Sequence, residues 1–151
     1  MNVLYASAIM AFLHHLAAFT LVATLAVEVA LFKPPLTLVQ ARRLRATDSL
    51  FGASAGVLLV VGLLRVFYFE KGAGYYFSNP YFLTKLSLFI AAALISIYPT
   101  VLFLSWKKAI QASTAPEIPA EQTRRARMCL MVEMTAIVGI LFCAPFMARG
   151  L

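Results

Sequence analysis

Ionisable side chains lie inside stretches of this chain that are otherwise almost entirely apolar: His14, His15, Glu28, Arg65, Lys85 and Glu133. Such side chains are costly to bury in hydrocarbon, so they indicate an ion pair, a ligand or a proton-transfer group. Neutral imidazole is an axial ligand of haem iron, and arginine and lysine bind carboxylates. The residue types therefore point to a site that binds a cofactor or another polar ligand.

The elements that must position these side chains are membrane helices. Of the 151 residues, 62% are apolar and only 13% are charged, whereas soluble domains carry about 25% charged residues. This composition excludes a disordered chain, a soluble binding domain and a disulfide scaffold. Four stretches reach the roughly 20 apolar residues that a membrane helix needs. We predict one all-α, integral membrane four-helix bundle over residues 1–151, with spans at about 3–32, 47–69, 80–106 and 128–148.

The net charge of +7 is concentrated in two of the predicted loops. Loop 33–46 contains four basic residues and loop 107–127 contains five: Lys33, Arg42, Arg43, Arg45, Lys107, Lys108, Arg124, Arg125 and Arg127. By the positive-inside rule these loops are cytoplasmic and both termini are periplasmic, in a bacterial inner membrane. The surplus charge is then an orientation signal, so we expect lipid and no nucleic acid as a partner.

The charges within the spans are segregated by depth. His14, Arg65 and Lys85 fall in the outer half of the predicted bundle, where the only carboxylate is that of Glu70. Glu28 and Glu133 fall in the inner half, and Asp48 lies at its rim. We expect these acids to form salt bridges with the loop arginines at positions 42, 43, 45, 124, 125 and 127, since such pairs form readily near helix ends.

Helical phase identifies which histidine faces the bundle. His14 shares its face with small and polar residues and with Glu28, whereas His15 shares its face with the bulky side chains Phe12 and Phe19. Because membrane helices pack through small residues, His14 is the better interior candidate and His15 the second choice. The GxxxG pattern at Gly52 and Gly56 favours a homo-oligomer or a larger membrane complex.

Three functions fit the basic residues of the outer half, which are His14, Arg65 and Lys85. In the first, His14 is the axial ligand of haem b and Arg65 and Lys85 neutralise the propionates, with His15 as an alternative iron ligand. In the second, a quinone binds beside the aromatic residues Tyr75, Tyr76, Phe77, Tyr81 and Phe82. In the third, His14 hydrogen-bonds across the bundle, for instance to Ser54 or Ser96, in a structural or accessory subunit. No motif for hydrolytic or nucleotide-driven chemistry is present.

A family resemblance favours the first of these functions. The run from Leu13 to Phe19, followed by Glu28, Arg65 and the segment YYFSNPYFLTKLSLF at 75–89, resembles a family of small bacterial four-helix membrane proteins. That family looks related to HemJ-type protoporphyrinogen oxidases and CopD-like membrane domains. HemJ-type proteins bind haem b and carry a histidine on the first helix and a lysine early on the third, which His14 and Lys85 match.

The resemblance implies a haem b-binding redox enzyme or electron carrier. It does not extend to two further HemJ-type motifs. A Pro-Arg pair after the first helix is replaced here by the sequence Lys33-Pro34-Pro35, and no Asn-Glu-x-Pro segment follows Glu133. The porphyrinogen-oxidising activity is therefore not carried over, and whether the chain is an enzyme stays open.

Overall fold

Four long helices dominate the computed structural model, which describes residues 3–149: α1 (Val3–Leu31), α2 (Leu38–Leu64), α4 (Pro80–Ser105) and α6 (Ala120–Arg149). A π-helical turn, η1 (Arg65–Phe69), extends α2, and two short helices, α3 (Ala73–Phe77) and α5 (Lys107–Gln111), lie in the connections. All four long helices are long and apolar enough to cross a membrane. The predicted all-α, four-span architecture is confirmed; residues 1–2 and 150–151 of the predicted domain lie outside the described range.

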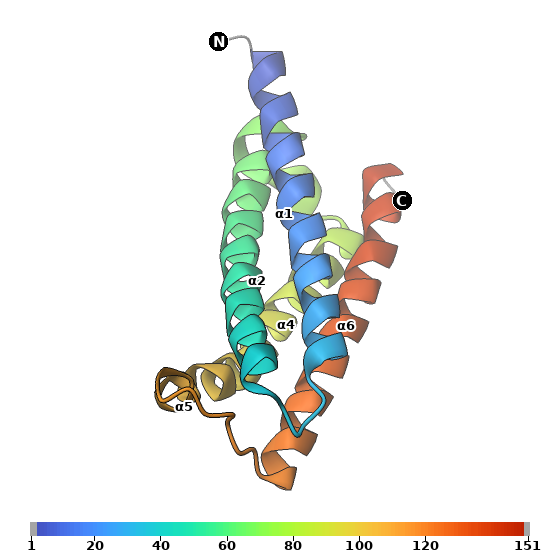
Figure 1. Ribbon diagram of the computed structural model, residues 1–151. Coiled ribbons are helices and arrows are strands. Elements are labelled where there is room, and N and C mark those ends of the chain that lie inside the picture. The colour runs from blue at the N-terminus through green and yellow to red at the C-terminus, as the bar shows by residue number, and fades with distance from the viewer. Residues whose placement is uncertain (1–2, 150–151) are drawn as a thin grey trace.

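The bundle consists of two helix pairs. Helix α1 packs along α2, and α4 packs along α6, with fewer contacts between the two pairs. Both ends of the chain and α3 lie at one end of the bundle, here called the terminal end (Figure 1). The opposite end, which holds α5 and the connections after α1 and α4, is here called the loop end. In this view α1 and α6 diverge towards the terminal end.

Local sequence signals explain where the helices begin. Thr37 caps α2: its hydroxyl accepts a hydrogen bond from the backbone N–H of Gln40, and the Gln40 side chain accepts one from the backbone N–H of Thr37. This reciprocal arrangement satisfies two backbone N–H groups that would otherwise lack a partner. The helix therefore begins nine residues before the predicted span at residue 47. Asn79 caps α4, and Pro80 occupies the first helical position; both residue types favour the start of a helix.

The segment 107–127, predicted as a cytoplasmic loop that leads into an interfacial helix start, contains one short helix and the first residues of α6. Helix α5 occupies its first five residues, and α6 begins at Ala120 rather than near residue 128. Helix α6 begins early because the segment between Ala120 and Arg127 is rich in good helix formers. In addition, Glu121 pairs with Arg124 and Arg125 one turn later, and such pairs stabilise a helix. Apolar content marks where the helix enters the membrane, not where it begins.

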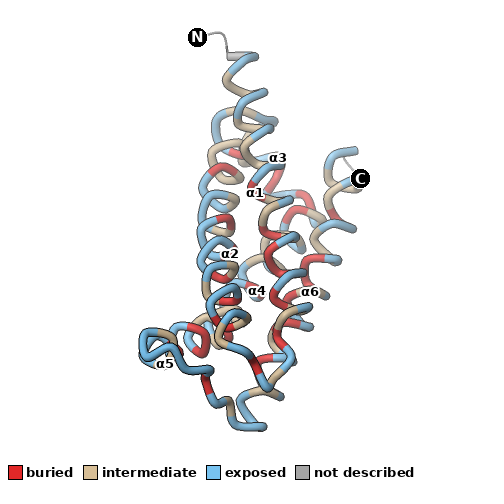
Figure 2. The backbone as a smooth tube through the Cα atoms, in the orientation of Figure 1, coloured by how far each residue is buried: buried red, intermediate tan, exposed pale blue. Residues whose placement is uncertain are grey.

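Burial follows the pattern of a bundle in lipid. Buried residues line the inner faces of the four long helices, and exposed residues cover their outer faces (Figure 2). Many of the exposed side chains are large and apolar, including Phe12, Phe19, Leu94 and Phe142. An apolar exterior of this kind suits contact with acyl chains and not with water.

The apolar interior is divided into two clusters. The larger fills the middle and the loop end, where Phe32 packs against Phe103 and Trp106. The smaller lies at the terminal end around Val66, Tyr76 and Phe82. Among the residues that the structure describes, none from α1 belongs to the smaller cluster. The outer part of α1 is therefore packed through other side chains, and His14 is one of them.

Candidate functional site

The His14 ring lies between α1 and α2, against a position that carries no side chain. A Cβ atom placed on Gly62 would lie 3.6 Å from Cε1 and 3.7 Å from Nδ1 of this ring. The Nδ1 atom is buried and has no hydrogen-bond partner. The hydroxyls of Ser54 and Ser96 instead donate to carbonyls of their own helices, those of Leu50 and Ala93. The alternative in which His14 hydrogen-bonds to one of these serines is therefore not observed, because a serine in a helix can donate to a carbonyl of the preceding turn.

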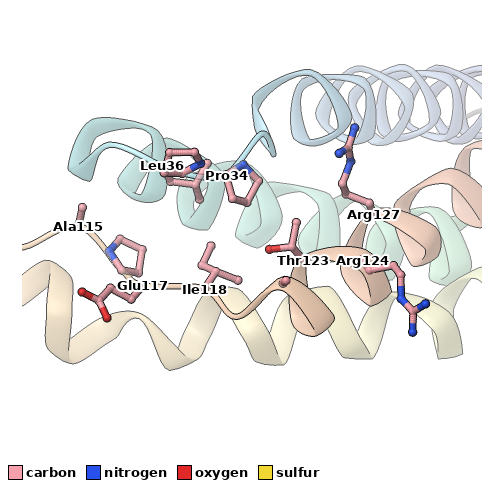
Figure 3. A pocket seen from close by; sticks show the side chains of 11 residues that line it. Pro34, Leu36, Ala115, Glu117, Ile118, Thr123, Arg124 and Arg127 are labelled. Carbon is pink, nitrogen blue, oxygen red and sulfur yellow. The ribbon is translucent and has the colours of Figure 1, made fainter.

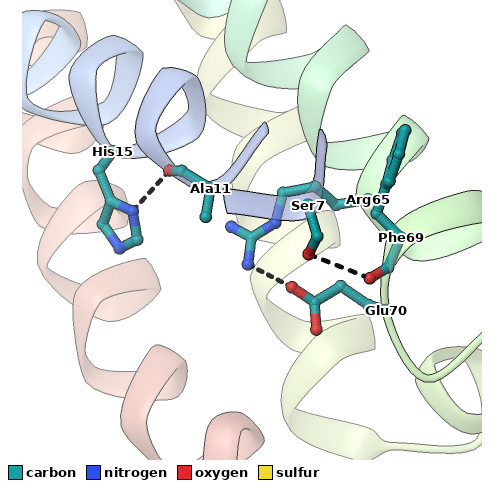
Figure 4. A network of polar contacts seen from close by, with 6 residues as sticks. All are labelled: Ser7, Ala11, His15, Arg65, Phe69 and Glu70. Atoms are coloured by element: carbon teal, nitrogen blue, oxygen red, sulfur yellow. Dashed lines mark hydrogen bonds and ion pairs between the residues drawn. The ribbon is translucent and has the colours of Figure 1, made fainter. Parts of the chain in front are cut away.

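His15 faces outwards, as its helical phase predicts. The residue is exposed, and its Nδ1 lies 2.7 Å from the carbonyl oxygen of Ala11 (Figure 4). Its ring centroid is 6.1 Å from that of His14, in an edge-on arrangement. A hydrogen bond at Nδ1 leaves Nε2 as the atom that can bind a metal. Any metal bound there would sit on the outer face of α1.

Arg65 begins the π-helical turn and is already engaged by an acid. Its guanidinium forms an ion pair with Glu70, the one carboxylate that the sequence places at this depth (Figure 4). The Nε atom of Arg65 is buried without a partner. The same turn is tied to α1, because the Ser7 hydroxyl donates to the carbonyl of Phe69 at 3.4 Å. Arg65 therefore has donors to spare, although its charge is partly neutralised.

Lys85 of α4 is the third basic residue near this site. It is half-buried on α4, and the charged or ionisable groups that act on it are Arg65 and Cys143, with no carboxylate among them. Lys85, Arg65 and His15 are the groups whose charges act on His14. The structure thus brings His14, Arg65 and Lys85 together from three helices, and we call these three residues the basic layer.

Aromatic rings close the terminal end above the basic layer. Tyr76 packs edge-on against Tyr75 and at a tilt against Phe82, each with ring centroids 5.3 Å apart, and Phe77 packs edge-on against Phe82. Burial and the nearby Glu70 carboxylate raise the pKa of the Tyr76 phenol, so it stays neutral. The rings predicted to line a quinone slot pack largely against each other and form a cap.

The acids of the inner half are not paired as expected. Glu28 and Glu133 are each only 1% exposed and Asp48 is 5% exposed. The ion pairs of residues 3–149 are Arg65 with Glu70 and Glu121 with Arg124 and Arg125. The predicted salt bridges are therefore wrong. Arg42 and Arg43 are exposed to the outside of the bundle, and two of the α6 arginines are taken by an acid on their own helix.

The three buried acids lie near one another instead. Asp48 and Glu133 both act electrostatically on Glu28, and Asp48 acts on Glu133. The Thr100 hydroxyl of α4 donates to Oδ1 of Asp48 at 2.7 Å. We call Glu28, Asp48 and Glu133 the acidic layer. The sequence predicts that all three acids lie at a similar depth in the inner half of the bundle, but it does not predict that their side chains meet.

The arrangement of the side chains in the two layers limits which metal sites they can form. The part of the chain that the structure describes holds no group of three His, Cys, Asp or Glu side chains arranged around one metal position. A site for a free metal ion would need such a group, whereas haem iron is held by its porphyrin and one or two protein ligands. His14 can therefore serve a haem, while the acidic layer lacks the geometry of a cation site.

A groove at the loop end does not form a binding site of this kind. It has a volume of about 910 Å³ and lies where the segment after α1 meets the start of α6 (Figure 3). The side chains of Arg124 and Arg127 line it but point in opposite directions, and Arg124 is paired with Glu121. The cations do not converge on one ligand position, so the basic layer remains the candidate site.

The comparisons with known proteins address the class of the protein. A family model described as "Predicted membrane protein (DUF2214)" matches residues 6–151, which covers all four long helices except the start of α1. No curated protein and no solved structure matches the chain. The family description agrees with the four apolar helices, and the chain is a multi-pass membrane protein.

Proposed function

The chain belongs to the DUF2214 family of predicted membrane proteins, and we propose that it binds haem b in the basic layer, as a redox enzyme or an electron carrier of the inner membrane. The observation that carries this proposal is the state of His14. Its ring packs against the bare backbone of Gly62, and its buried Nδ1 has no protein partner. A buried polar atom without a partner is costly, so it calls for a functional explanation.

The residues of the basic layer fit the chemistry of haem b. Imidazole binds haem iron, and the two propionates of haem need cations or hydrogen-bond donors. Lys85 has no carboxylate acting on it, and Arg65 keeps a buried Nε free beside its ion pair with Glu70. The two propionates would therefore bind Lys85, which is unpaired, and Arg65, which also pairs with Glu70.

Each residue has a distinct role in this proposal. His14 would ligate the haem iron, and Lys85 and Arg65 would hold the propionates, while Glu70 orients Arg65. The aromatic rings around Tyr76 exclude water from the terminal side. Bound haem supplies one-electron redox chemistry. His15 is the alternative iron ligand, and its exposed position suits a haem held at the outer face of α1 or shared with a second copy.

The orientation of the chain follows from its charges. The nine basic residues at the loop end favour a cytoplasmic position for that end, by the positive-inside rule. The basic layer then lies in the periplasmic half of the membrane, where propionates would reach the interface. An electron partner would approach the haem from the periplasmic side or through the lipid.

Absorption spectroscopy of the purified protein tests the proposal. We expect a Soret band in wild-type protein from haem-replete cells, and loss of most of it in His14→Ala. His15→Ala is the matched control, since it removes a neighbouring imidazole that points out of the bundle, and it is expected to keep the band. Size-exclusion profiles establish that each variant is folded. No Soret band in the wild type, or an unchanged band in His14→Ala, contradicts the proposal.

Quinone is the competing ligand for the same layer. If haem-free protein binds a quinone analogue and the Arg65→Ala variant does not, the ligand of the basic layer is a quinone and not haem. The packing of Tyr75, Tyr76 and Phe82 against one another argues against it, because a quinone ring needs an open aromatic slot. A structural or accessory subunit would show neither ligand.

A further inference from the structure

The acidic layer holds three carboxyl groups inside the bundle with no cation paired to any of them. Glu28 comes from α1, Asp48 from α2 and Glu133 from α6, and Thr100 of α4 donates to Asp48. Oε1 of Glu28 and both carboxyl oxygens of Glu133 are buried and have no hydrogen-bond partner. All four long helices thus meet at this layer through a polar side chain.

Few charged residues of the four long helices lie near the acidic layer. Between His15 and Lys33, α1 carries only Glu28, and between Lys85 and Lys107, α4 carries no charged residue. On α2, Arg45 precedes Asp48 by one turn and no charge follows until Arg65. On α6, Arg127 precedes Glu133, with the Cys129 thiol between them, and no charge follows until Arg149. Every nearby cation therefore lies on the loop side of the layer.

Three ionised carboxylates cannot persist in this setting. Each would be buried away from water without a counterion, and each would repel the other two. A carboxyl group in that position lowers its free energy by taking up a proton, which converts it into a neutral hydrogen-bond donor. A metal ion would serve the same end, but the described side chains are not arranged around one.

We propose that the acidic layer is a proton-binding site within the membrane, loaded and unloaded from the loop end. When it is loaded, Glu28 and Glu133 are protonated. On release, an O–H bond of Glu28 or Glu133 breaks, the proton passes to water at the loop end, and the layer gains one carboxylate. The Thr100 hydroxyl continues to donate to Asp48, and Arg45, with its unpartnered Nε on the loop side, is the nearest cation that can offset the added negative charge.

The position of Arg45 supports loading from this end. Its Nε is buried and has no partner, and it lies one turn from Asp48 towards the loop end. On the other side of the layer, the larger apolar cluster separates the acids from the basic layer, and no helix carries a charged residue there. The buried polar residues on the terminal side, Thr24 and Ser54, are uncharged and donate to carbonyls of their own helices. The nearest cation, Arg45, lies on the loop side, so release of a proton is favoured towards the loop end.

Infrared spectroscopy of the full chain in lipid vesicles tests this proposal. A protonated carboxyl absorbs at a carbonyl frequency distinct from that of a carboxylate, and the band shifts in heavy water. We expect wild-type protein at neutral pH to show this band, and Glu28→Gln and Glu133→Gln each to lose a part of it. Glutamine copies the shape of protonated glutamate, so both variants are expected to fold, and Asp48→Asn provides a third. Glu117→Gln, at an exposed loop acid, is the matched control and leaves the band unchanged.

Sidedness is tested in vesicles that hold the protein in one orientation. A pH step on the loop side is expected to change the band, and a step on the terminal side is expected to leave it unchanged. Absence of the band, or a band that neither glutamine variant alters, overturns the proton site. A response to the terminal side overturns the loading route. His14→Ala keeps the band, so this test is independent of haem.

Discussion

At the residue scale, the central feature is a histidine packed against a glycine. Any side chain larger than hydrogen at position 62 would approach the His14 ring, which lies 3.6 Å from where a Cβ would be. That distance is ordinary van der Waals contact for a single methyl group, so alanine fits. A branched side chain would add further carbons to the space that the imidazole fills. Gly62 therefore sets the position of the ring.

Substitution of Gly62 tests this positional role. We expect Gly62→Ala to retain haem, and Gly62→Val to displace the His14 ring, at a cost of about 1–3 kcal/mol for overpacking. If that cost falls on the haem-bound state, it corresponds to about 5- to 150-fold weaker haem retention. The haem-to-protein ratio after transfer to apomyoglobin measures it. Equal retention in Gly62→Ala and Gly62→Val would show that the ring position does not matter.

Lys85 and Arg65 differ in a way that their sequence positions do not reveal. Both are basic residues at similar depth, but Arg65 is paired with Glu70 and Lys85 has no acid acting on it. We expect Lys85→Met to lower haem occupancy more than Glu70→Gln does, because only the first change removes a cation from the layer. Occupancy measured by pyridine haemochrome decides this, and the reverse order would place the propionates elsewhere.

At the element scale, the end of α2 departs from a regular helix. The residues Arg65 to Phe69 form a π-helical turn, a rare feature that is frequent at functional sites. The wider turn carries an extra residue, so it changes the direction in which Arg65 and its neighbours point. Bulky residues such as Val66 and Phe67 suit a regular helix equally well, so no sequence signal marks this turn.

The outer face of α2 carries the two glycines of the GxxxG pattern. Gly52 and Gly56 are exposed, and nothing lies within 4 Å of a Cβ placed on either one. They are thus not used to pack this bundle. We expect a second copy to pack there, so that Gly52→Ile with Gly56→Ile lowers the dimer fraction in crosslinking experiments. Leu59→Ile on the same helix is the control. An unchanged dimer fraction in the glycine variant would remove this face as the contact.

At the scale of the whole molecule, the charges form two separate layers. His14 and Glu28 are 14 residues apart on α1, which corresponds to about 21 Å along the helix. Apolar side chains of the larger cluster, including Leu21 and Leu25, fill the space between them. The basic layer and the acidic layer are therefore well separated, the first towards the terminal end and the second towards the loop end.

Orientation can be tested with single cysteines. In a background in which Cys129 and Cys143 are replaced by alanine, Gly74→Cys reports on the terminal end and Ala115→Cys on the loop end. A membrane-impermeant maleimide is expected to label Gly74→Cys in spheroplasts and Ala115→Cys only in inverted vesicles. The opposite labelling pattern would place the basic layer in the cytoplasmic half.

The sequence predicts the bundle far better than it predicts its polar contacts. Span number, the Asn79 cap and the inward face of His14 follow from composition and helical phase, which are local properties. The partners of Glu28 and Glu133 depend on how four helices are rotated against each other, and proximity to loop arginines was a poor guide. The ion pair of Arg65 was foreseeable, because Glu70 is the only acid at its depth.

Chemical rescue tests the central claim, that His14 ligates haem, most directly. His14→Gly leaves the space of one imidazole beside Gly62. We predict that this variant purifies without a Soret band, and that haem together with free imidazole restores a band at the wild-type position, whereas haem alone does not. A Soret band of wild-type intensity in His14→Gly without imidazole would contradict the account.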